Sequence, residues 1–190
     1  MSFFFALNQV FVTGPTVYFQ DDCTDTNGTN WSSHTPNVGS SPTYGTGVVT
    51  IQSNKAQRQS GSPQPIFDYG HADYTKTLSL NRGTSTFVGA IVRYSNANNY
   101  WLFFYSSGTN VLTLYEVNGG TQTSRATGSV TLSASTAYNA SITCTGNSIS
   151  MTINGVTVSY ASASFNNTAT KGGIYQMGAG TEVDTILVTS

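Results

Sequence analysis

The feature of this sequence that most constrains its fold is an alternation of apolar and polar residues with a period of two. The segments 151–153 and 156–158 alternate in this way on either side of Asn154-Gly155. Successive side chains of a strand point to opposite faces, and Asn-Gly accepts the positive φ angles of a tight hairpin turn. A second hairpin is predicted around Val117–Gly120, and helical periodicity is scarce. The sequence therefore predicts an all-β, antiparallel domain.

The alternating runs predict strands at 17–20, 48–52, 55–59, 74–80, 86–94, 100–105, 111–117, 121–127, 137–144, 148–153, 156–160, 173–177 and 183–189. Two stretches, 21–47 and 60–64, carry turn residues instead. Long irregular segments in compact domains are usually functional or held down by contacts. A chain of 190 residues fits one β domain. We draw one boundary, between an arm at 1–14 and a domain at 15–190.

The chain carries very little charge. Charged residues make up 8% of it and the net charge is −1, against about 25% charged residues in an average soluble domain. The Lys and Arg residues are scattered singly, so no basic stripe exists to neutralise phosphates, and nucleic acid is excluded as an expected partner. A surface of Ser, Thr, Asn and Gly is typical of proteins outside cells and on virus particles.

Two cysteines, Cys23 and Cys144, lie far apart in strand-like, apolar surroundings. They are interpreted either as buried thiols that act as small hydrophobic groups or as one bridge between an early and a late strand. Metal binding by this pair is not expected, because neither has a Cys or His neighbour in the sequence.

The first residues form a strongly apolar arm, with Phe3, Phe4, Phe5, Leu7, Val10 and Phe11 as its large side chains. The arm lacks the basic start of a signal peptide and is too short to span a bilayer. We expect it to anchor the domain against neighbouring subunits, because a free apolar terminus is an aggregation hazard. The alternative is an edge strand within its own domain.

Three patches resemble one superfamily. They are Asp21–Thr29 followed by Ser32–Pro36, then Val92–Trp101, and then Val183–Val188. Together they are similar to laminin-G-like, concanavalin A-like jelly-roll domains, as found in phage virion and bacterial surface proteins, although Cys23 stands where an aromatic residue is usual. The resemblance implies a sandwich of two antiparallel sheets with adjacent terminal strands. The fold does not by itself fix the function.

An oxygen-rich cluster near the start of the domain is a candidate metal site. The EF-hand spacing fails because Cys23 occupies a ligand position. The resemblance instead implies a structural Ca²⁺ held by Asp22, Asp25, Asn27 and Asp184, the last of these from the closing strand. The alternative is that Asp25 and Asn27 build Asx turns. No other cofactor is expected.

Candidate glycan-binding residues lie on adjoining predicted strands or, for Asn99, in the turn between them. They are Arg93, Tyr94, Asn99, Tyr100, Trp101 and Tyr115. Alternation places about half of such side chains on the solvent side of a sheet, and exposed aromatic residues there mark a binding face. The alternative is that these aromatic side chains fill the core.

The sequence predicts no enzyme. Glycosidases of the superfamily carry several carboxylates on one strand in a Glu-x-Asp-x-(x)-Glu pattern, and retaining chemistry needs two carboxyl groups about 5–5.5 Å apart. Neither Glu116 nor Glu182 lies in that pattern, and no Gly-x-Ser-x-Gly turn accompanies His34 or His71. Both histidines are expected in loops, making hydrogen bonds.

Together these features predict a bacteriophage virion structural protein, such as a capsid decoration, head-fibre or tail-surface protein. Its arm would contact other virion proteins in a homo-oligomer at the particle surface, and its jelly roll would face solvent and host glycans. The alternative is a stand-alone carbohydrate-binding lectin module.

Overall fold

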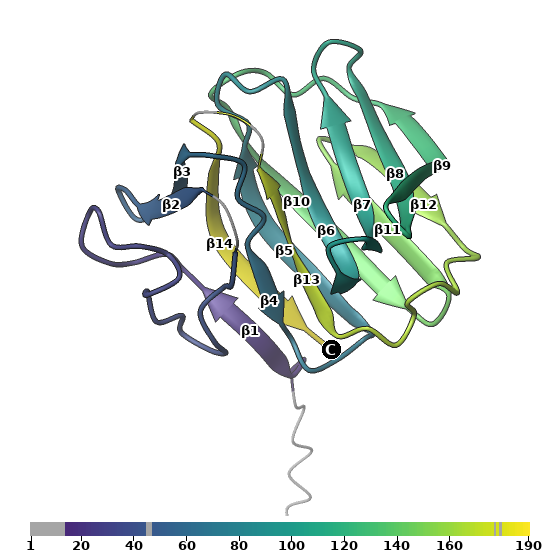
Figure 1. Ribbon diagram of the computed structural model, residues 1–190, viewed down its shortest axis with the longest axis horizontal. Helices are drawn as coiled ribbons and strands as arrows, with labels where there is room; N and C mark the ends of the chain where they lie inside the picture. Colours follow the sequence, from purple (N-terminus) through teal and green to yellow (C-terminus); the bar gives the residue numbers. More distant parts are fainter. Residues whose placement is uncertain (1–13, 45–46, 177, 179) are drawn as a thin grey trace, which may run out of the picture.

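The computed structural model describes residues 14–44, 47–176, 178 and 180–190 as strands, turns and bends. Two antiparallel sheets pack face to face as a sandwich (Figure 1), which confirms the predicted all-β fold class. None of the described residues belongs to a helix with the length and hydropathy needed to cross a membrane. The anchoring residues Phe3–Phe11 lie outside the described part of the chain, so their role stays a prediction.

The larger sheet has eight strands. Its order is β12 (Val156–Tyr160), β11 (Ser148–Ile153), β10 (Ala137–Thr145), β5 (Tyr74–Asn81), β14 (Glu182–Thr189), β3 (Ala56–Ser60) and β2 (Val48–Ile51), and β1 (Val17–Asp21) also pairs with β14. The first and last strands therefore lie side by side, as the resemblance implied, with Val17 opposite Thr189.

The second sheet has six strands. Its order is β4 (Ile66–Asp68), β13 (Lys171–Gln176), β6 (Phe87–Asn96), β7 (Asn99–Ser106), β8 (Val111–Asn118) and β9 (Thr121–Ser129). Every predicted strand has a counterpart in the two sheets, within a few residues at its ends. Only β4 was missed, because its three residues follow Pro63 and Pro65 and are too few to show an alternation.

The main core lies between the sheets and is rich in aromatic side chains. The ring centroid of Phe67 lies 4.8 Å from that of Phe19 and 5.3 Å from that of Trp31. Trp101 and Phe103 of β7 belong to the same core. Full burial of such a side chain contributes about 1.5–3 kcal/mol. Cys23 and Cys144 are both buried free thiols, so the alternative of a bridge between them is wrong.

A bulge in β6 sends one charged side chain into the interior. Arg93 has a φ of 48°, and the pairing of β6 with β7 shifts register just after Val92. As a result Val92 and Arg93 are both buried on the inner side. The Arg93 guanidinium donates hydrogen bonds to the carbonyl oxygens of Ala163 and Gly146 and so fastens two connections to the sheet.

Candidate functional site

The outer face of the six-stranded sheet carries a second apolar cluster, separate from the main core. Its buried members are Ile91, Tyr100, Leu102 and Val117, and its half-buried members are Ile66, Tyr94, Phe104, Tyr115 and Tyr175. These residues alternate along β6, β7 and β8 with the residues of the main core. We call this surface the aromatic face. An outward apolar cluster of this kind makes the face a candidate binding surface.

Phe104 is the centre of the aromatic face. Its ring centroid lies 5.1 Å from that of Phe87, 6.2 Å from that of Tyr115 and 5.9 Å from that of Tyr175. The last two contacts are edge-on, a favourable geometry for aromatic pairs. Burial raises the pKa of the Tyr175 phenol, so this hydroxyl stays protonated and neutral at physiological pH. The face thus offers packed rings together with neutral hydroxyl groups.

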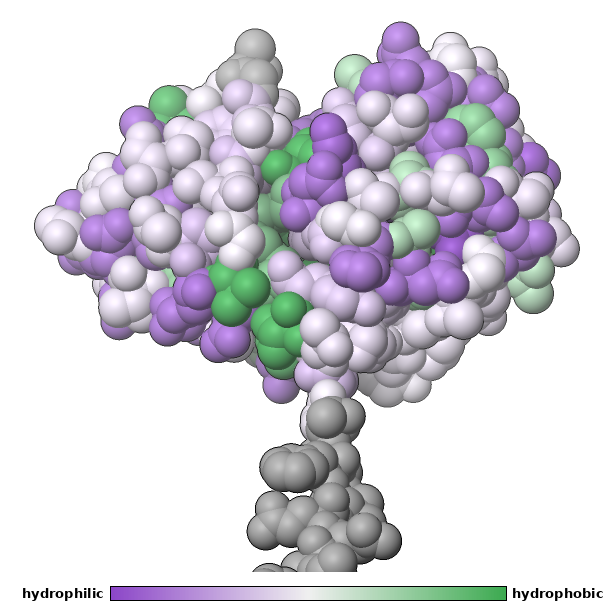
Figure 2. Space-filling view, turned by 90° about the horizontal axis from the view of Figure 1, so that it is seen from below, coloured by the Kyte–Doolittle hydropathy of each residue, from purple (hydrophilic) through white to green (hydrophobic). Residues whose placement is uncertain are grey.

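A groove of about 670 Å³ lies at the β4 edge of this face. Figure 2 shows it as a hollow between two lobes of the surface. Its lining combines one aromatic ring from the face with hydroxyl and amide groups and one pair of opposite charges: Ser40, Ser41, Thr43, Tyr44, Ser62, Gln64, Ile66, Phe67, Asp68, Tyr94, Ala97 and Lys171. This volume is in the range of ligand-binding pockets, about 300–1,000 Å³.

The charges in the groove are few and nearly balanced. Asp68 accepts hydrogen bonds from the Gly70 N–H and the Thr170 hydroxyl, and these bonds hold the pKa of its carboxyl group below the ordinary value. Lys171 is close enough to add to that effect. Among the described residues, the groove therefore holds one carboxylate and one ammonium group, and the remainder of its lining is uncharged.

The wall of the groove comes from the segment 21–44, which the structure ties down at several points. Val38 and Thr43 form isolated bridges to Gln20 and Ile66, and Asn30 bridges Thr50. Of the two expectations for the long irregular segment, function or contacts that hold it down, the second is met over residues 21–44. Thr43 lies beside β4, so the segment covers the edge of the six-stranded sheet and closes one side of the groove.

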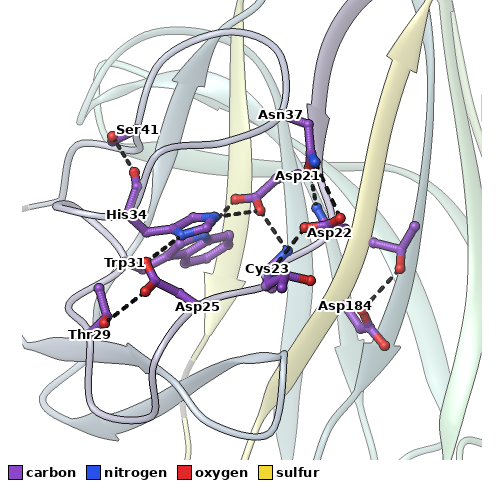
Figure 3. Close-up of polar contacts among 12 residues, drawn as sticks. Asp21, Asp22, Cys23, Asp25, Thr29, Trp31, His34, Asn37, Ser41 and Asp184 are labelled. Atoms are coloured by element: carbon purple, nitrogen blue, oxygen red, sulfur yellow. Dashed lines mark hydrogen bonds and ion pairs between the residues drawn. The ribbon is translucent and has the colours of Figure 1, made fainter.

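A buried histidine organises that segment (Figure 3). The two ring nitrogens of His34 lie 3.0 Å from a carboxylate oxygen of Asp21 and 3.0 Å from one of Asp25. Because an ionised carboxylate only accepts hydrogen bonds, this arrangement favours an imidazolium, in which both ring nitrogens of His34 donate. Asp21 is buried and also accepts hydrogen bonds from the Trp31 indole N–H and the Cys23 N–H.

The electrostatics of this cluster agree with its geometry. Burial lowers the pKa of His34, but the hydrogen bond to Asp25 and the charge of Asp21 outweigh burial and leave that pKa raised. The hydrogen bond from His34 in turn lowers the pKa of Asp25. Ser41 lines the groove and donates to the carbonyl oxygen of His34, so the cluster is linked directly to the groove wall.

The predicted calcium site is not assembled. Asp22 accepts from the Thr24 N–H and the Asn37 amide, Asp25 binds His34, and Asn27 accepts from the Ser53 N–H. Asp184 lies across β14 from the other carboxylates, where it accepts from Thr185 (Figure 3). No group of three metal-binding side chains exists within the described ranges. The assignment of Asp22, Asp25, Asn27 and Asp184 to one ion is therefore corrected: they form turns and local hydrogen bonds.

Five of the six predicted glycan-binding residues divide into two groups. Tyr94, Tyr100 and Tyr115 belong to the aromatic face, while Arg93 and Trp101 are fully buried on the inner side of the same sheet. Arg93 and Trp101 are thus corrected to structural residues, and the Trp101 indole donates to the Phe165 carbonyl.

Asn99 is the first residue of β7, directly after the β6–β7 turn. Its amide donates to Asn96, and its oxygen accepts from the Gly119 N–H. Phe104 and Tyr175 were missed, although both stand in predicted strands at the right parity. The sequence of residues 40–44 contains no pattern from which their place in the groove lining could be predicted.

Glu116 and Glu182, the two glutamates considered as catalytic carboxylates, lie in different sheets. Glu116 of β8 forms an ion pair with Arg125 at 2.8 Å, whereas Glu182 of β14, in the other sheet, accepts from Lys55, Gln57 and Asn81. The two therefore do not form a close pair for retaining glycoside hydrolysis. The second loop histidine, His71, stacks on Tyr18 with ring centroids 3.7 Å apart.

No protein-family model matches the sequence, and no curated protein matches it. Solved structures of similar fold include the carbohydrate-binding module CBM66 from Bacillus subtilis, with a TM-score of 0.57 at 12% identity over 78% of this chain and 91% of that chain. Galectin LEC-6 of Caenorhabditis elegans has a TM-score of 0.56 at 12% identity, over 72% of this chain and 96% of that chain. A GH43 protein from Bacillus licheniformis has a TM-score of 0.58 at 13% identity, over 75% of this chain and 34% of that chain. At these identities the likeness establishes a shared jelly-roll fold.

Proposed function

We propose that this domain binds carbohydrate through the aromatic face and the adjoining groove. The observation that carries the proposal is the outward aromatic cluster around Phe104, which ends at Tyr94 in a groove lined by hydroxyl and amide groups. Sugar rings present apolar C–H surfaces and polar hydroxyls together. Tyrosine matches both, because its ring is apolar and its hydroxyl donates and accepts hydrogen bonds.

The charges of the groove favour a neutral glycan. Asp68 and Lys171 offset each other, and the remaining lining residues are uncharged, most of them with hydroxyl or amide groups. A strongly acidic glycan would meet the Asp68 carboxylate without a surplus of positive charge to compensate. The fold shared with a carbohydrate-binding module and a galectin supports the same ligand class.

A glycan array followed by calorimetric titration of the best ligand tests this function. Tyr115→Ala removes an edge-on ring from the face and is expected to weaken binding by about tenfold, or about 1.4 kcal/mol. Tyr138→Ala is the matched control, because Tyr138 is also half-buried but belongs to β10 in the other sheet. Equal losses in both variants, or an array without a hit, would contradict the proposal.

We further propose that the domain is displayed on a bacteriophage virion, with the arm at 1–14 docked to other virion proteins in a homo-oligomer. The apolar arm and the low charge of the chain support this setting. The test is deletion of residues 1–14. We expect the shortened chain to keep its glycan binding and lose its assembly; normal assembly would refute the anchor while leaving the glycan proposal intact.

A further inference from the structure

The outer face of the eight-stranded sheet contains a hollow of about 640 Å³ with a different chemistry from the groove. Five of its polar lining residues come from three neighbouring strands: Thr77, Ser79, Asn139, Ser141 and Thr152. Most of these side chains are exposed, and the hollow has no aromatic lining residue among those described. Hydroxyl and amide groups of this kind both donate and accept hydrogen bonds.

A strained bulge in β14 forms the remaining side of this hollow. The pairing of β14 with β5 shifts register between Asp184 and Leu187, and Thr185 has a φ of 47°. A β-branched residue in the left-handed region is a genuine outlier, and such strain persists only where the surrounding structure enforces it. Because Val183 and Ile186 both stay in the core, the bulge turns Asp184 and Thr185 together toward the outer face.

The bulge also orients the carboxylate of Asp184. The Thr185 hydroxyl donates to one carboxylate oxygen at 2.9 Å. Neighbouring Glu182 differs, because its carboxylate already receives hydrogen bonds from Lys55, Gln57 and Asn81. No ion pair within the described residues involves Asp184. The Asp184 carboxylate is therefore held in one orientation and lines a hollow together with neutral hydrogen-bonding groups.

The geometry points to a second binding site, centred on Asp184, for a neutral saccharide recognised through its hydroxyl groups. A carboxylate accepts hydrogen bonds from two adjacent hydroxyls of a sugar ring, and Thr77, Ser79, Asn139 and Ser141 stand around it to bind others. Asp184 repels acidic sugars. The site has its own residues and lies on the opposite sheet, so it does not depend on the aromatic face and would make one domain bivalent.

A titration of the ¹⁵N-labelled full-length chain, followed by NMR, tests the site. The probes are methyl α-glucoside, methyl α-mannoside and methyl β-galactoside, with glucuronate as the acidic counterpart. At least one neutral glycoside is expected to produce saturable shifts at the amides of Ser79, Ser141 and Thr185. Glucuronate is expected to produce none there.

Three variants separate this site from its surroundings. Asp184→Asn and Ser141→Arg should each lower the affinity obtained from these shifts by about fivefold or more. Ser159→Arg adds the same charge to the same sheet outside the hollow and should leave that affinity unchanged. Tyr115→Ala should also leave it unchanged. No saturable shift on this face with any neutral probe, shifts that survive Asp184→Asn, or equal binding of glucuronate would each overturn the proposal. Failure of the aromatic face alone would instead appear as array or calorimetric results insensitive to Tyr115→Ala.

Discussion

The two outer faces of the sandwich are built by the same kind of strand and have opposite chemistry. The six-stranded sheet turns Phe104, Tyr115 and Tyr175 outward, while the eight-stranded sheet turns outward Thr77, Ser141 and their neighbours. Strand alternation alone requires one side of each sheet to be apolar, because that side forms the core. An apolar cluster on the other side of one sheet is additional to what the fold needs. The contrast shows that the core and the proposed binding surface are specified by different residues of the same strands.

The largest effect is expected from truncation at the centre of the aromatic face. Phe104→Ala removes contacts with three rings, so it should lower the free energy of unfolding by about 2 kcal/mol. It should also abolish glycan binding by the aromatic face and the adjoining groove. Ser141→Ala, on the opposite face, should change stability by less than about 0.5 kcal/mol. Urea unfolding of both variants checks the pair. A similar stability of the two would mean that the aromatic cluster does not pack as described.

A second effect concerns the wall of the groove, where the charge of His34 lies between two carboxylates. The pKa of His34 is raised in the folded chain, so its stabilising effect is complete below its unfolded pKa, about 6.5, and is lost as the pH rises through the higher folded value. Unfolding free energies of the wild type from pH 5 to pH 9 should therefore fall over the upper part of that range.

His34→Gln serves as the comparison for that pH series. The variant has no titrating imidazole, so it should be less stable than the wild type at low pH and should lack the decline above the unfolded pKa of histidine. Because Ser41 is bound to the His34 backbone, glycan affinity at the groove should follow the same pH dependence. A parallel pH profile in both proteins would show that His34 is not a buried imidazolium.

The smallest effect is expected from the one cation of the groove. Lys171 is exposed, and its interaction with Asp68 is screened by solvent. Lys171→Met should therefore change the affinity for a neutral glycan by less than about threefold and leave stability nearly unchanged. Calorimetric titration checks this. A loss greater than the one caused by Tyr115→Ala would move the main recognition from the aromatic rings to the charge.

Sequence pattern was sufficient to predict most of the fold, because alternation and turn dipeptides act locally. It predicted the strand 86–94 but not that a bulge at Arg93 would turn this side chain inward, since the bulge depends on contacts with Ala163 and Gly146. Trp101 was assigned to the wrong side for a different reason. The pattern shows that alternate residues differ in direction, and only the packing of the sheets decides which set faces the core.

The candidate site was predictable only in part. Tyr94, Tyr100 and Tyr115 were identified because they stand on adjoining strands, but the groove wall depends on His34, Asp21 and the bridges that place residues 40–44 beside β4. These contacts join residues with no regular spacing, so no period in the sequence reports them. The calcium prediction failed for a related reason: carboxylates that cluster in sequence became hydrogen-bonded to separate partners.

A crystal structure of the domain with the best oligosaccharide from the array tests the aromatic face most directly. We expect a sugar ring packed against the exposed edges of Tyr115, Phe104 or Tyr175, with a neighbouring unit reaching Tyr94 and the groove beside β4. An oligosaccharide bound elsewhere, with the aromatic face left in contact with solvent, would contradict the claim that the outward rings of the six-stranded sheet form the principal binding surface.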